Sequence, residues 1–79
     1  MHSPRTTIQF ALRQEYIELN KLLKVTGVSD SGGEASALIV SGAVRVDGAT
    51  ELRKACKIRP NQIIETHTAR IVVLATAQK

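Results

Sequence analysis

Apolar and polar residues alternate near the start of the chain. Ile8, Phe10 and Leu12 are separated by Gln9 and Ala11. A period of two places every second side chain on the same side of an extended backbone. The pattern predicts a first strand with one inward face.

The apolar spacing changes to that of a helix between residues 18 and 26. Its apolar face consists of Leu19, Leu22 and Leu23. Lys21 and Lys24 fall off this face and are predicted to be exposed. Gly27 follows at the point where a glycine readily ends a helix.

A second helix is predicted over residues 32–41. Ser31 is a typical N-cap residue, and Glu34 three positions later completes a capping box. The inward positions are Ala35, Leu38 and Ile39. Gly42 then provides the C-terminal stop.

The rest of the chain is typical of short strands joined by turns. The segment 44–46 alternates valine with arginine, and Asp47-Gly48 is a strong hairpin signal. A returning strand and basic connection (49–58) and strands at 63–64 and 70–74 follow. The predicted fold class is therefore α+β, with two packed helices against a small, largely antiparallel sheet.

A chain of 79 residues has room for one domain and one modest core. The hydrophobic content of 43% argues against disorder. We predict a single domain over residues 1–79 that frays at 1–7 and 75–79.

No set of residues suggests catalysis. Cys56 is the only cysteine, so neither a disulfide framework nor a cysteine zinc site is expected. Cys56, His67, Asp30 and Glu34 form no recognisable nucleophile, base or metal constellation. We expect no enzyme activity, no cofactor, no metal and no small-molecule substrate.

The chain shows no signal peptide and no apolar run long enough to span a bilayer. We therefore expect a cytoplasmic protein without membrane association. We also expect a monomer.

The charge pattern favours a polyanionic partner. The formal net charge is +4 and the isoelectric point is about 9.7. Four cations crowd one short segment, with Arg45 just across the hairpin turn: Arg53, Lys54, Lys57 and Arg59. Such a segment is either a solvated loop or a surface that follows phosphates. Phe10 and Tyr16 are the only aromatic residues, which argues against recognition by aromatic stacking.

The ordered set of these motifs resembles the RNA-binding domain of the ribosomal protein S-four family, also called the alpha-L motif. The matching residues are Leu19, Leu22, Leu23, Ser31, Ala35, Leu38, Ile39, Gly42, Val44, Val46, Asp47 and Gly48. The resemblance covers about residues 17–65. The small size and the basic segment 53–58 are most similar to the stand-alone YbcJ-type bacterial members.

This resemblance implies a stand-alone protein that recognises structured RNA, with ribosomal RNA as one candidate, through a basic surface and phosphate contacts. The candidate RNA-binding residues are Lys21, Lys24, Ser29, Ser31, Arg45, Arg53, Lys54 and Lys57. We expect the serines of the inter-helix loop at the surface, where helix-start amides and hydroxyls could hold a phosphate. Asp30 and Glu34 would repel that phosphate, and Gly32-Gly33 stands where many relatives place a cation. An alternative function is a protein-interaction module that binds an acidic partner.

Overall fold

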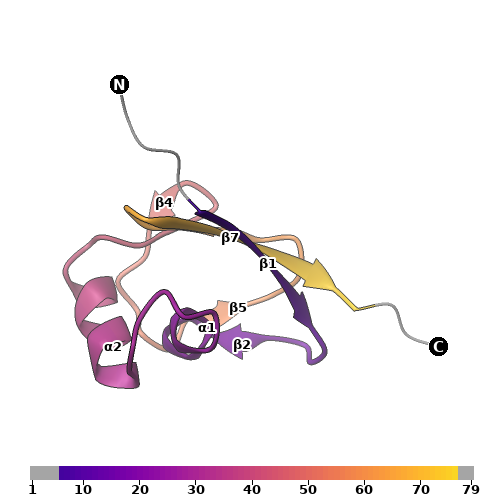
Figure 1. Cartoon of the computed structure of the whole chain (residues 1–79), viewed down its shortest axis with the longest axis horizontal. Coiled ribbons are helices and arrows are strands. Elements are labelled where there is room, and N and C mark those ends of the chain that lie inside the picture. The colour runs from indigo at the N-terminus through magenta and orange to yellow at the C-terminus, as the bar shows by residue number, and fades with distance from the viewer. Residues whose placement is uncertain (1–5, 77–79) are drawn as a thin grey trace.

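The computed structural model describes residues 6–76 as two helices and seven strands (Figure 1). In chain order they are β1 (Thr6–Leu12), β2 (Ile17–Glu18), α1 (Leu19–Val25), α2 (Gly32–Val40), β3 (Arg45–Val46), β4 (Ala49–Thr50), β5 (Lys57–Ile58), β6 (Ile63–Glu65) and β7 (Ala69–Ala75). This confirms the predicted α+β class. Within residues 6–76, neither helix has the length and apolar character needed to cross a bilayer.

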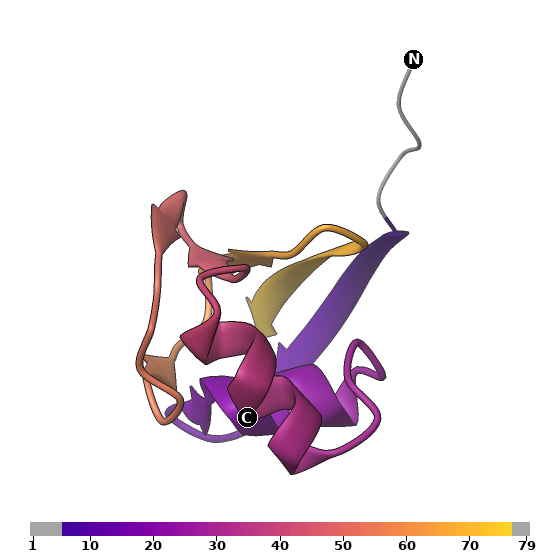
Figure 2. The same ribbon diagram turned by 90° about the vertical axis from the view of Figure 1, so that its left-hand side faces the viewer.

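The strands form a five-stranded mixed sheet in the order β1-β7-β6-β3-β4 and a separate ribbon of β2 with β5. Both helices lie on the same side of the large sheet (Figures 1 and 2). Four of the five strand pairings are antiparallel. The fifth and longest, between β1 and β7, is parallel, with a register that runs from Thr6 opposite Ala69 to Leu12 opposite Ala75. The alternation in β1 predicted the strand and gave no sign of this parallel partner.

The core lies between the sheet and the helices. It is built from Leu12, Leu19, Leu22, Leu23, Ala35, Ile39, Val44, Ile58, Ile64, Ile71 and Val73. The three leucines predicted for the inner face of α1 are fully buried, and in α2 Ala35 and Ile39 are buried while Leu38 packs against the core. Helical spacing therefore identified the buried faces correctly.

The ends of α2 follow the predicted signals. Ser31 Oγ accepts a hydrogen bond from the amide of Glu34 at 3.1 Å, as in a capping box. The Glu34 carboxylate returns to the amide of Asp30 at 2.7 Å rather than to that of Ser31. At the other end, Gly42 has φ +87° and its amide donates to the carbonyl of Ile39, which satisfies one of the last helical carbonyls.

The hairpin turn is also as predicted. Asp47 and Gly48 have φ values of 52° and 86°, the signs that a two-residue type I′ turn requires. The Asp47 carboxylate accepts hydrogen bonds from Gln62 Nε2 and from the amide of Ile63, both at 3.0 Å. Asn61 has φ +76°, a left-handed conformation that asparagine tolerates, in the turn that joins β5 to β6.

Several predicted boundaries need correction. The predicted fraying at 1–7 and 75–79 is wrong at Thr6, Thr7 and Ala75, which lie in paired strands. Positions 1–5 and 77–79 lie outside the described residues. The returning strand predicted from Ala49 is only two residues long, because the chain leaves the sheet after Thr50 to reach the ribbon.

Candidate nucleic-acid interface

The first turn of α1 is held by a basic loop from far along the chain. Glu18, at the N-cap position, makes no side-chain capping hydrogen bond. Instead, the amide of Leu19 donates to the carbonyl of Cys56 at 2.9 Å, and that of Asn20 donates to the carbonyl of Lys54 at 3.0 Å. These carbonyls satisfy amides that a helix start otherwise leaves unpaired. The loop is thereby attached to the end of α1 that carries Lys21.

The ribbon of β2 and β5 places one more cation, Lys57, at this end. Ile17 pairs with Ile58 and packs toward the core, whereas the next pair along is Glu18 with Lys57. Because neighbouring residues of a strand face opposite sides, this second pair points away from the core. Lys21 Nζ lies 3.9 Å from Glu18 Oε1, and Lys57 is the cross-strand partner of the same residue.

We call the three exposed lysines around the start of α1 the α1 cluster: Lys21, Lys54 and Lys57. Lys24 is also exposed and lies three residues beyond Lys21 on the helix. Residues three apart on a helix are neighbours on its surface. The structure thus brings together four of the eight residues predicted to contact RNA.

Arg53 is beside this cluster but is already engaged. Its Nε donates to Glu51 Oε2 at 2.9 Å and its terminal nitrogen to Oε1 at 3.2 Å. These hydrogen bonds from Arg53 lower the pKa of Glu51 to about 2. Burial raises the pKa of the nearby Cys56 thiol, which lies 3.7 Å from the guanidinium. Arg53 and Glu51 therefore form a paired group rather than a free cation.

The two large apolar residues at the ends of the basic segment differ in burial. Ile58 is fully buried, whereas Leu52 is 57% exposed and does not anchor the loop in the core. The loop is fixed instead by its backbone bonds to α1 and by the Glu51–Arg53 pair.

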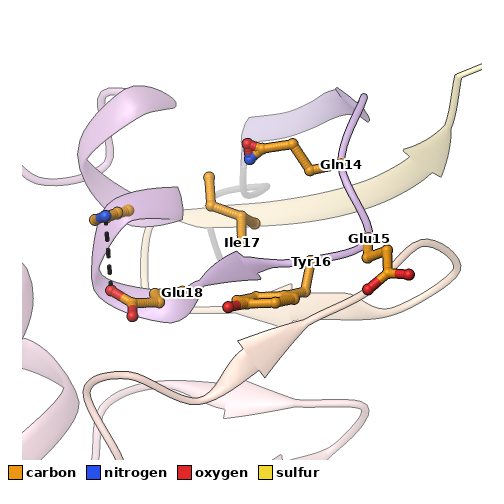
Figure 3. Close-up of a pocket in the computed structure, with 6 residues that line it drawn as sticks. Gln14, Glu15, Tyr16, Ile17 and Glu18 are labelled. Atoms are coloured by element: carbon orange, nitrogen blue, oxygen red, sulfur yellow. Dashed lines mark ion pairs between the residues drawn. The ribbon is translucent and has the colours of Figure 1, made fainter.

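Two residues outside the predicted set belong to the same region. Lys57 Nζ lies 4.9 Å from the centre of the Tyr16 ring, and Arg59 Cζ lies 5.9 Å from it. Tyr16 also lines a hollow next to α1, which Figure 3 shows. The scarcity of aromatic residues in the sequence argued against a role for Tyr16, and the ribbon that positions this residue was not predicted from the sequence.

Arg45 lies elsewhere. It sits on β3 opposite Thr50 and Glu65, and it lines a different hollow together with Glu65 and His67. β3 pairs with β4, and β4 lies well apart from β5 in the molecule (Figures 1 and 2). Arg45 is therefore not part of the α1 cluster, contrary to what its closeness in sequence suggested.

The inter-helix loop differs from expectation at Ser29. This serine is only 3% exposed, so its expected place at the surface is wrong. Its amide donates to the carbonyl of Leu23 at 3.0 Å, which draws the residue against the end of α1. Ser31 is exposed, but its hydroxyl already caps α2. The described residues contain no cluster of three His, Cys, Asp or Glu side chains placed to hold a metal.

Comparison with known proteins agrees with this architecture. The S4 domain family model matches residues 10–74. "Putative RNA-binding protein YbcJ" of Escherichia coli strain K12 is 42% identical over 62 residues, covering 76% of this chain and 89% of that protein, and YbcJ of Shigella flexneri matches to the same extent. The solution structure of E. coli YbcJ, described as revealing an αL motif involved in RNA binding, superposes with a TM-score of 0.66 at 37% identity, over 95% of this chain and 94% of that one. With the helix pair, the hairpin and this match in hand, the chain belongs to the S4 domain family.

Proposed function

We propose that this protein binds structured RNA through the α1 cluster, and that it does so without catalysing a reaction. The observation that carries the proposal is the attachment of the basic loop to α1 by the carbonyls of Lys54 and Cys56. Without that attachment, Lys54 would have no fixed relation to Lys21, whereas Lys57 is also positioned by its pairing with Glu18.

The chemistry of the cluster suits phosphates. Its lysines are exposed, and flexible ammonium groups at a surface can displace the counterions condensed on RNA. Double-stranded RNA hides its base edges in a deep groove, so recognition by shape and backbone contacts is expected. The relatives named above support this proposal, because YbcJ is named for RNA binding.

Finer features belong to the same proposal. We expect Lys24 to extend the contact surface along α1, and we expect the protein to act as a monomer in the cytoplasm. Structured ribosomal RNA is the first RNA class to test. Arg45 and Ser31 are expected to contribute less, because one lies on a separate part of the sheet and the other caps a helix.

The test compares two exposed cations on different parts of the surface, Lys54 and Arg70. Lys54→Gln should weaken binding to structured RNA and reduce the slope of log affinity against log salt by about 0.7 to 0.9, the change expected for a single phosphate. Arg70→Gln removes the same charge from β7 and should change both quantities much less. Equal effects of the two variants would mean that net charge alone governs binding and would contradict the proposed site.

The alternative of an acidic protein partner makes a different prediction. The purified complex should then survive nuclease treatment, and structured RNA should fail to compete with the partner. Loss of that partner in Lys54→Gln, with no RNA bound to the wild-type protein at low salt, would replace RNA binding as the function.

A further inference from the structure

We propose that the hollow beside Tyr16 binds one unpaired nucleobase of the RNA, preferably guanine, stacked on the Tyr16 ring. This inference rests on the proposed function, since the α1 cluster would bind the phosphates on either side of that base. It adds recognition of a base to a surface that otherwise contacts only the phosphates of the RNA backbone.

The ring lies on the outer face of the ribbon. In the antiparallel register, Ile17 is opposite Ile58, so Tyr16 lies one step outward, next to Arg59. Lys57 lies in β5 and Arg59 directly follows it, and residues two apart along an extended chain point to the same side. Both approach the tyrosine ring, at 4.9 and 5.9 Å from its centre. Two cations suited to phosphate thus adjoin an aromatic surface suited to a base.

The ring is only partly covered by these cations. Tyr16 is half-buried, and it lines a hollow of about 390 Å³ whose wall is otherwise the segment 14–18 and Lys21. This volume falls within the range of about 300–1,000 Å³ typical of small-ligand pockets. Stacking of an unpaired base on an aromatic side chain is a common means of reading RNA outside its helical regions.

The polar groups of the hollow favour a base over a phosphate. Figure 3 shows Glu15 and Glu18 at the two ends of the Tyr16 ring. Carboxylates repel phosphate and only accept hydrogen bonds. Glu18 lies close to Lys21, whereas Glu15 is exposed at the outer end. A carboxylate there can accept hydrogen bonds from the neighbouring N1–H and N2–H groups of guanine, while uracil presents carbonyl oxygens on either side of its one N–H.

A single aromatic platform fits a single base. Phe10, the only other aromatic residue, lies in β1 and packs against the core. The expected ligand is therefore a duplex-like RNA with one extruded base rather than an extended single strand.

The test uses three hairpin RNAs with the same stem: one fully paired, one with a bulged guanine and one with a bulged uracil. Wild-type protein should bind the guanine bulge about tenfold more tightly than the paired stem, an effect within the range for one stacked base. Tyr16→Phe should keep this ratio and Tyr16→Leu should reduce it to about one, with thermal unfolding confirming that both variants fold. Glu15→Gln should reduce the preference for guanine over uracil, whatever its effect on overall affinity.

A direct readout is available because the chain has one tyrosine and no tryptophan. The Tyr16 ring proton resonances should move upfield on addition of the guanine bulge and much less with the paired stem. Binding all three RNAs equally, with no such shift, would overturn this inference and leave the proposed function intact. Failure to bind any of them would instead overturn the proposed function.

Discussion

The two loops at the ends of α1 satisfy the terminal backbone groups of the helix in different ways. At the C-terminal end, the residues that follow the helix do so: Gly27 has φ +83°, and the amide of Ser29 donates a hydrogen bond to the carbonyl of Leu23. At its start, the helix is closed by carbonyls of Lys54 and Cys56, more than thirty positions away in the chain. One end is a local motif, whereas the other depends on the completed fold.

The same two loops differ in charge. The loop and helix start over residues 26–34 contain two carboxylates, Asp30 and Glu34, and no cation. The segment 53–59 contains four cations and no carboxylate. The loop that closes α1 locally therefore carries acidic groups, and the loop that closes its start from a distance carries cations of the proposed RNA surface. A surface built in this way exists only in the folded protein.

The largest expected effect lies in the helix that both loops share. Leu23→Ala removes a fully buried side chain from α1 and should lower the free energy of unfolding by about 2–5 kcal/mol. Chemical denaturation monitored by circular dichroism measures this loss. Val25→Ala is the matched control, because Val25 is 59% exposed on the same helix, and it should change stability by less than about 0.5 kcal/mol. Equal effects of the two variants would mean that the inner face of α1 is wrongly assigned.

A second variant tests the local closure. Gly27→Ala places a Cβ at φ +83°, and the left-handed conformation costs an L-residue about 1–2 kcal/mol. The expected result is a loss of that size in unfolding free energy. Gly32→Ala is the comparison, because Gly32 begins α2 with open space around its Cβ position and no positive φ. That change should leave stability unchanged or raise it by up to about 1 kcal/mol, since alanine has less backbone freedom in the unfolded chain.

The smallest effect concerns the loop that closes the start of α1. Arg53 lowers the pKa of Glu51 from 4.5 to about 2, so the ionised carboxylate stabilises the folded state above pH 4.5. This contribution should disappear as the pH falls from 4.5 toward 2. The melting temperature of Glu51→Gln should be slightly below that of wild type at pH 7, and the difference should vanish near pH 2. A difference that stays constant with pH would show that the pair does not contribute through ionisation.

Features that depend on local contacts were predictable from the sequence, and features that depend on distant residues were not. The helix ends and the hairpin are formed by contacts within a few residues, so their sequence patterns indicated them: Ser31 with Glu34, Gly27, Gly42 and Asp47-Gly48. The parallel pairing of β1 with β7 depends on which strands meet in space, and alternation alone carries no such information. Ser29 was misplaced because its polarity suggests exposure, while its backbone bond to Leu23 draws it inward.

The sequence indicated which cations could belong to the candidate site, but it did not indicate which of them lie together. The cations of 53–59 stand out in the sequence, as do Lys21 and Lys24. Their grouping required the contact of the loop with α1, and the pairing of Arg53 with Glu51 required the loop conformation. Arg45, close in sequence to the same segment, lies apart from it because β3 belongs to the large sheet.

The parallel pairing of β1 with β7 has a consequence for the order of folding during synthesis. Among the strands within residues 6–76, β1 is synthesised first and its partner β7 last. Residues so distant in sequence pay a large loop-closure entropy before their contacts form. β1 carries the apolar residues Ile8 and Phe10, and its backbone has no neighbouring strand to pair with until β7 has been synthesised. Nascent chains that stall after β6 should therefore be sensitive to protease in the β1 region, and completion of β7 should confer protection.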